Sequence, residues 1–312
     1  MDEVRVRSVD GEVEITLDRP RAINSLSGGM IAEVGRLVAA GPRRVVLRGA
    51  GDRGFCAGAD VRELRSLSLS DPRGAADWLD AEYDVDLALA EVGEGTAHLH
   101  GVSMGGGLGL ALRLGRVEAT TDLELAMPET GIGLWPDVGV CFELSRAPRL
   151  AGRHLAMTGE SVDAASALWA GLVDVVVDGD GEELDVDPTD SVLAGDADWI
   201  QACYDTSDPV AVVDRLRARP EERARRAADL IATRSPLSVA VALEAVIRAE
   251  QAADLAQVLD TDRALGRSFM ADSDFAEGVR AQLVDKDRTP HWRHRSVAQV
   301  GRAEVEAMFD PQ

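Results

Sequence analysis

The sequence of 312 residues is poor in lysine, in cysteine and in long apolar runs. Its only lysine is Lys286, a bias toward arginine that a GC-rich genome explains, although the acidity also fits a halophilic source. Three scattered cysteines, Cys56, Cys141 and Cys203, are too few for a disulfide framework, so a reducing, cytoplasmic setting is expected. No run approaches the roughly 18 apolar residues of a membrane span, which argues against a membrane protein.

Basic charge is also scarce, because 33 Lys and Arg residues face 55 Asp and Glu residues and the formal net charge is −22. A chain this acidic repels nucleic acid and anionic membranes, so neither is expected as a partner. A small phosphate-bearing ligand remains compatible with the composition, since a local group of arginines can override the global field.

Alternating strand and helix patterns run to about residue 180 and predict an α/β core. Residues 178–198 contain nine acids and no basic residue, so 181–205 is expected to be an exposed linker or loop. Beyond it the apolar spacing is helical. The sequence thus predicts three regions: an α/β core over 1–180, an acidic linker over 181–205 and a helical region over 206–312. Within the core, 96–102 is expected to be one strand.

Two acids, Glu129 and Asp137, lie in one short segment, 127–139, whose prolines and glycines rule out a regular helix. Just upstream, the glycine-rich run 103–109 is expected to open a helix, which offers unpaired N–H groups and a positive dipole end. Acids beside oriented N–H donors suit acyl chemistry, since they supply a base or nucleophile and a hole for an oxyanion.

Each of these features also has a simpler explanation. Asp137 precedes a predicted helix at 138–146 and could be only its N-cap. The glycines could serve only close packing of a helix against a strand. His98 and His100 alternate on a predicted strand, but no third ligand joins them by pattern, so no metal site is predicted.

Several motifs in order resemble the crotonase (enoyl-CoA hydratase/isomerase) superfamily. They are the segments 55–60 (Phe-Cys-Ala-Gly-Ala-Asp), 101–107 (Gly-Val-Ser-Met-Gly-Gly-Gly), 155–159 and 170–174. Within the superfamily the chain is similar to the 3-hydroxyisobutyryl-CoA hydrolase group, through 128–139, 275–280 and 285–292. The resemblance covers nearly the whole chain.

The resemblance implies an α/β fold of stacked ββα units, with two roughly perpendicular sheets and a helical C-terminal region. It also implies an acyl-CoA thioester as substrate, with no metal or further cofactor. Carried over by motif, the two N–H donors of the oxyanion hole belong to Ala59 and Gly106. Glu129 would be the nucleophile or the general base, and Asp137 would protonate the leaving thiolate or hold a hydroxyl of the substrate.

Further substrate contacts are expected from residues beside these motifs. Asn24 fits the first turn of the superfamily, and Gly105 belongs to the glycine run. Arg21 and Arg62 are candidates to meet the phosphates of coenzyme A. Trp135 and Phe142 are expected to line the acyl pocket, with core packing as the alternative.

Gly109 stands where hydratases of this superfamily usually carry a second glutamate. A glycine supplies neither acid nor base, so the resemblance favours a hydrolase of valine breakdown over a hydratase. An isomerase that works with Glu129 alone and a non-catalytic acyl-CoA-binding protein are the two alternatives. The family suggests a homo-oligomer, trimer or hexamer, and an apolar stripe that includes Leu237, Val241, Leu243 and Val246 is expected to serve self-association.

Overall fold

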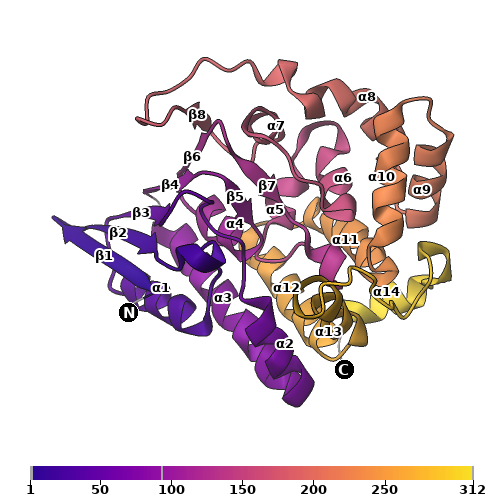
Figure 1. The fold of residues 1–312 in the computed structure, drawn as a ribbon, viewed down its shortest axis with the longest axis horizontal. Helices are drawn as coiled ribbons and strands as arrows, with labels where there is room; N and C mark the ends of the chain where they lie inside the picture. Colours follow the sequence, from indigo (N-terminus) through magenta and orange to yellow (C-terminus); the bar gives the residue numbers. More distant parts are fainter. Residues whose placement is uncertain (1–2, 93, 311–312) are drawn as a thin grey trace.

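The strands form one six-stranded sheet and one two-stranded sheet in the computed structural model, which describes residues 3–92 and 94–310 (Figure 1). The large sheet has the order β1-β2-β3-β4-β6-β8, with β1 antiparallel to β2 and every other pair parallel, and β5 pairs with β7 in the small sheet. The strands are β1 (Val4–Val9), β2 (Glu12–Leu17), β3 (Arg44–Gly49), β4 (Gly95–Leu99), β5 (Val102–Met104), β6 (Arg116–Thr120), β7 (Glu124–Ala126) and β8 (Val175–Val177).

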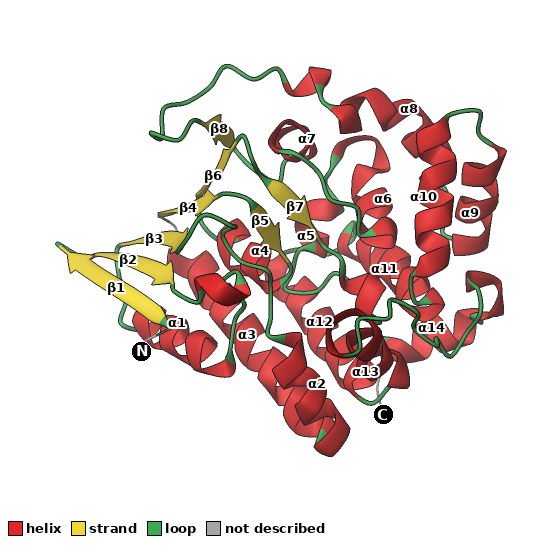
Figure 2. Ribbon diagram, viewed as in Figure 1, coloured by secondary structure: helices red, strands yellow, loops and turns green. Residues whose placement is uncertain are grey.

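Helices make up most of the remaining structure (Figure 2). The α-helices are α1 (Gly28–Ala39), α2 (Val61–Ser70), α3 (Pro72–Val92), α4 (Gly106–Leu112), α5 (Cys141–Leu144), α6 (Ala151–Thr158), α7 (Ala164–Ala170), α8 (Val192–Tyr204), α9 (Pro209–Ala218), α10 (Glu222–Thr233), α11 (Pro236–Ala249), α12 (Leu255–Met270), α13 (Ser273–Val279) and α14 (Arg302–Met308). Two short helical turns matter for the site, the 3₁₀ turn η2 (Glu129–Ile132) and the π-helical turn η5 (Arg280–Val284).

Local sequence accounts for the elements of the core. Asp10 and Gly11 both take positive φ, at 49° and 84°, which matches the two-residue turn that joins twisted antiparallel strands. The side chain of Ser27 caps α1 by accepting from Met30 N. Local sequence thus accounts for the antiparallel pair β1–β2 and for the start of α1.

Helix α3 lies at the centre of the molecule and links its two halves (Figure 1). It packs against α1 and α2 of the N-terminal half and against α12 of the C-terminal half. Leu79, Tyr83 and Leu89 of α3 are buried in the main core. The functional groups described below come from α3 and from the loops that end beside it.

The prediction of an acidic linker over 181–205 is wrong for its second half. Helix α8 (Val192–Tyr204) begins there, with Ser191 as its N-cap. Trp199, Ile200 and Tyr204 are buried and join the core, because the acids lie between apolar residues at helical spacing. The single strand expected over 96–102 is also wrong: β4 ends at Leu99, and β5 belongs to the small sheet.

The apolar stripe of α11 does not form an exposed face. Leu237, Val241, Leu243 and Val246 are at most 1% exposed, and α11 packs against α5, α6 and α14 of its own chain. The argument from this stripe to self-association is therefore wrong, and the oligomeric state stays a prediction. Among the described residues, no single helix has the length and apolarity of a membrane span; only α10 and α11 together, bent by 118°, reach them.

Candidate active site

A pocket of about 210 Å³ opens where two glycine-containing segments meet beside α3. The first segment precedes α2 and the second begins α4. A Cβ on Gly58 would lie 3.3 Å from Gly105 Cα and 3.4 Å from Gly106 N, so the two backbones touch because neither side carries a side chain there. The pocket is lined by Ala57, Gly58, Ala59, Val61, Leu64, Leu79, Glu82, Gly105, Gly106, Pro128, Glu129, Ile132, Leu134, Asp137, Gln282 and Leu283.

Two backbone N–H groups line this pocket. Bonds from Leu26 N to Gly58 O (2.9 Å) and from Asp60 N to Leu26 O (2.7 Å) fix the chain on both sides of Ala59. Gly106 is the first residue of α4, so no intrahelical partner exists for its N–H. In the described part of the chain, no backbone carbonyl accepts the N–H of Ala59 or Gly106. Both donors are thus free for a ligand at the positive end of the helix.

Carboxyl groups surround these donors. A Cβ on Gly105 would lie 2.8 Å from Glu129 Oε1, and a Cβ on Gly106 would collide with Glu82 Oε1. Glu82 and Glu129 are 1% and 7% exposed. Glu82 Oε1 and Glu129 Oε2 have no hydrogen-bond partner among the described residues. Buried polar atoms are usually paired, so these free oxygens point to a ligand or solvent in the pocket.

Asp137 supplies the third carboxyl of the pocket. Its Oδ2 accepts a 2.9 Å hydrogen bond from the hydroxyl of Tyr83 on α3. The interpretation of Asp137 as an N-cap is excluded, because α5 begins only at Cys141 and has no side-chain cap. Asp137 is 6% exposed and lies in the same cavity as Glu129. We refer to Glu82, Glu129 and Asp137 as the pocket carboxyls.

Burial raises the pKa of all three pocket carboxyls, and repulsion from Asp137 adds to the rise for Glu82 and Glu129. Burial takes the pKa of Asp137 to about 6, and the hydrogen bond from Tyr83 opposes the rise. The pKa of Glu129 lies well above its usual range because of burial and the nearby Asp137. Near neutral pH this pair therefore holds a proton, so it offers an acid and a base in one cavity.

Gly109, the site of the missing glutamate, has no room for any side chain. A Cβ there would lie 2.6 Å from Val138 Cβ and 3.1 Å from Asp86 Oδ1. Val138 fills this space with a φ of 54°, which is rare for a β-branched residue. The carboxyl that accompanies Glu129 in the pocket therefore comes from the loop, as Asp137, and not from α4.

Three of the predicted substrate contacts do not line the pocket. Asn24 is fully buried, and its amide donates to the carbonyls of Ala50, Gly54 and Phe55, so it holds a turn. Trp135 is also fully buried and donates from Nε1 to Asp262. The ring of Phe142 packs under the guanidinium of Arg146 at 3.5 Å. Core packing and local contacts, rather than ligand binding, account for these three side chains.

The two predicted phosphate contacts are also outside the pocket lining. Arg21 is exposed on the surface. Arg62 is exposed too, and its Nη2 donates to Leu283 O at 2.7 Å. Leu283 and Gln282 belong to η5 and close the pocket from the C-terminal region. Arg62 thus ties α2 to the segment that closes the pocket.

The sequence reasoning missed Glu82. Positions 75, 79, 82, 86 and 89 form one buried stripe of α3, and two of the five are acids, Glu82 and Asp86. Charged residues at positions that helical spacing assigns to the core are a usable signal, because a buried charge needs a reason. Asp86 has no hydrogen-bond partner for either oxygen among the described residues, and burial raises its pKa well above the usual range.

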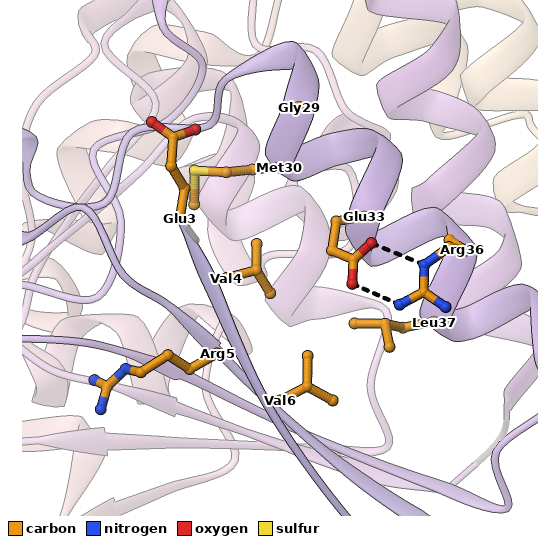
Figure 3. Close-up of a pocket in the computed structure, with 9 residues that line it drawn as sticks. All are labelled: Glu3, Val4, Arg5, Val6, Gly29, Met30, Glu33, Arg36 and Leu37. Carbon is orange, nitrogen blue, oxygen red and sulfur yellow. Dashed lines mark hydrogen bonds and ion pairs between the residues drawn. The ribbon is translucent and has the colours of Figure 1, made fainter. Parts of the chain in front are cut away.

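A larger groove and two histidines lie elsewhere in the molecule. The groove, of about 1050 Å³, lies between β1 and α1, but its two acids are already paired, Glu33 with Arg36 (Figure 3) and Glu3 with Arg19. His98 contacts Glu118 at 2.9 Å, whereas His100 contacts Gly51 O. Across residues 3–92 and 94–310, no three His, Cys, Asp or Glu side chains are arranged to hold a metal ion.

Comparison with known proteins agrees with this geometry. The chain is 30% identical to the rat mitochondrial 3-hydroxyisobutyryl-CoA hydrolase, over 95% of this chain and 85% of that protein. The fold superposes on a carnitinyl-CoA dehydratase from Mycobacterium thermoresistibile (TM-score 0.95, 34% identity, 100% and 97% coverage). It also superposes on an enoyl-CoA hydratase from Rhodobacter sphaeroides 2.4.1 (0.93, 30%, 99% and 98%). The profile of the enoyl-CoA hydratase/isomerase family matches residues 13–185 and 180–309, so the chain belongs to that family and has the crotonase fold.

Proposed function

We propose that the protein hydrolyses short 3-hydroxyacyl-CoA thioesters, with 3-hydroxyisobutyryl-CoA of valine breakdown as the specific substrate. The observation that carries the proposal is the placement of Glu129 against Gly105, directly beside two free N–H donors, with Asp137 in the same cavity. The names of the curated relatives support it, since they are hydrolases of that thioester.

The proposed chemistry uses each group once. The thioester oxygen accepts from Ala59 N and Gly106 N, and such donors are worth roughly 3–4 kcal/mol each in a transition state. Glu129 acts as the carboxylate, with the proton of the pair on Asp137, and either attacks the carbonyl carbon to form a mixed anhydride or removes a proton from the attacking water. The carbon–sulfur bond then breaks, and Asp137 gives its proton to the leaving thiolate. On the anhydride route, water then cleaves the bond between the acyl group and Glu129 and returns a proton to Asp137; on the general-base route, the proton taken from water passes from Glu129 back to Asp137. One water is consumed, and free coenzyme A and a hydroxy acid are released.

The size and lining of the pocket support a short, hydroxylated acyl group. A cavity of about 210 Å³ between Leu64, Leu79 and Leu134 suits only a few carbon atoms. The free oxygen of Glu82 is an acceptor without a donor among the described residues, and a substrate hydroxyl would supply that donor.

A second candidate is the hydration or dehydration of a CoA thioester. Two solved structures that superpose on the chain with TM-scores of 0.95 and 0.93 are a dehydratase and a hydratase by name, which is the observation in its favour. Hydration needs an acid and a base on one face of the double bond. Gly109 and Val138 leave no side chain at the position from which α4 would supply one.

A thiol-release assay separates the two candidates. The purified protein is offered plain, unsaturated and 3-hydroxylated acyl-CoAs of equal chain length, and both free thiol and loss of the double bond are followed. Fast thiol release from the hydroxylated members is expected. Hydration of the unsaturated members with no thiol released from any thioester would overturn the proposal in favour of the second candidate.

A further inference from the structure

The loop that carries Asp137 has an unusual backbone. Val138 and Gly139 take positive φ in succession, at 54° and 74°. Glycine adopts this region freely, but a β-branched residue does so only where its surroundings hold it. Something must therefore fix the loop in the shape that delivers the carboxyl of Asp137 into the pocket.

The carboxylate of Asp262, on α12, bonds the loop on both sides of Asp137. Its Oδ1 accepts from Trp135 Nε1 at 2.8 Å, and its Oδ2 accepts from Gly139 N at 2.8 Å. Asp262 is 1% exposed, so both bonds lie out of water. Each oxygen of this one buried side chain accepts one hydrogen bond, and the two bonds together leave the loop little freedom.

The helix that presents Asp262 is itself fixed to the rest of the site. Arg263, the next residue of α12, pairs with Asp84 of α3 at 2.7 Å. The ring of Trp135 stacks on Phe269 of α12 with centroids 4.9 Å apart. Since α3 also supplies the hydroxyl of Tyr83 to Asp137, the two packed helices hold the loop and the acid together.

We propose that Asp262 is a positioning residue for Asp137: it clamps the segment 135–139 from behind and so sets the carboxyl of Asp137 in the pocket. Asp262 does not line the pocket and does not touch the substrate. The inference rests on the proposed function for its kinetic readout, but its structural readout is independent of any activity.

The variant Asp262→Asn tests the clamp. An asparagine of nearly the same shape keeps one acceptor, but its amide nitrogen cannot accept from the second N–H, so one of the two bonds is removed. We expect kcat for thiol release to fall at least about tenfold while KM changes less than about twofold, because the loosened loop no longer holds the carboxyl of Asp137 in place for the transition state. In the Asp137→Asn background the same change is expected to lower kcat little further.

Asp196→Asn is the matched control. Asp196 is also a buried acceptor of an indole N–H, from Trp199 at 2.9 Å, and it pairs with Arg223, but neither Asp196 nor Trp199 lines the pocket. This variant is expected to lose stability with kcat unchanged. Equal losses of kcat in the two variants would show a general effect of stability and overturn the proposal.

A crystal structure of Asp262→Asn gives the readout that does not need turnover. We expect the 2.9 Å hydrogen bond from Tyr83 Oη to Asp137 Oδ2 to lengthen or break as the loop shifts. A hydrogen bond that persists unchanged would overturn the proposal even if the wild-type protein released no thiol. If the wild type releases no thiol and the variant nevertheless breaks this hydrogen bond, the proposed function alone is refuted.

Discussion

Two groups of acidic side chains in this molecule have the same chemistry and opposite behaviour. The pocket carboxyls are buried with one another, and burial raises the pKa of each. At the surface, Arg280 pairs with Glu277, Asp285 and Asp287 at 2.6–2.8 Å. Hydrogen bonds from Arg280 lower the pKa of Glu277 and take that of Asp287 to about 2. We call this second group the arginine cluster.

The different surroundings of the two groups explain how one residue type serves two purposes. A carboxyl beside a guanidinium in water stays ionised and can only hold structure. A carboxyl buried without a cation takes up a proton near neutral pH, so it can donate or accept one during a reaction. One short element joins the two surroundings, since η5 begins at Arg280 of the arginine cluster and lines the pocket through Gln282 and Leu283.

The largest effect is expected when an ionisable group is removed from the pocket carboxyls. Glu129→Gln should nearly abolish thiol release, and Asp137→Asn should lower kcat by at least about 10²-fold, because acid–base assistance is worth about 10²–10⁴-fold. Asp287→Asn, in the arginine cluster, is the control and should leave kcat unchanged. The measurement is steady-state kinetics on folded proteins. Near wild-type turnover by folded Asp137→Asn would show that Asp137 takes no part in proton transfer.

The next effect adds a carboxyl to the pocket region. Gly109→Glu places a side chain where even a Cβ would lie 2.6 Å from Val138. Overpacking of a core costs about 1–3 kcal/mol or more, so the variant should unfold at lower denaturant and gain no hydratase activity. Chemical unfolding and a hydration assay measure both. A stable variant that hydrates enoyl-CoAs would show that the loop can move aside.

A smaller effect is expected from the Tyr83 hydroxyl that donates a hydrogen bond to Asp137. Tyr83→Phe removes the hydrogen bond that lowers the pKa of Asp137, so that pKa should rise above about 6. A hydrogen bond of about 1 kcal/mol corresponds to roughly 0.7 pH unit. The basic limb of the kcat/KM profile, where Asp137 loses the proton that it donates, should therefore move to higher pH by about that amount. If the limb stays in place, the group that titrates there is not Asp137.

The smallest expected effect is on the pH dependence of stability, to which the buried Asp86 and the surface Asp287 should contribute with opposite sign. Burial raises the folded-state pKa of Asp86, so the wild type should lose stability relative to Asp86→Asn as pH rises above about 4. Asp287 has a lowered folded-state pKa, so its contribution is present above about pH 4 and is lost as pH falls toward 2. Thermal unfolding across pH 3–8 measures both slopes. Parallel pH dependence of the two variants would contradict the comparison.

The backbone part of the site could be predicted from the sequence, because it depends on glycine. Gly58 and Gly105 take positive φ at the contact of their two segments, and α4 begins at Gly106 as the glycine run indicates. Glu129 and Asp137 were predicted together, since no regular helix can separate them. They share one cavity, whereas their roles in a reaction remain predictions.

The side chains that meet only through packing could not be predicted. Glu82 comes from a helix far from either motif, and its direction depends on how α3 lies against α4 and α12. Trp135 was expected in the acyl pocket because it stands beside Asp137. Trp135 instead donates to Asp262 of α12, while Leu134 and Asp137 line the pocket. Spacing along an irregular loop does not show which of its side chains face a helix that lies far away in the sequence.

The walls of the pocket are far apart in sequence, and this has a consequence for synthesis. They come from the segments 57–64, 79–82, 105–106, 128–137 and 282–283, so a growing chain lacks part of the cavity until nearly its full length has left the ribosome. Until then the pocket carboxyls stay hydrated and titrate as ordinary acids. Formation of the site thus waits for the last helices, and a chain cut short before α12 carries the glycine motifs and all three pocket carboxyls but lacks the wall that η5 supplies.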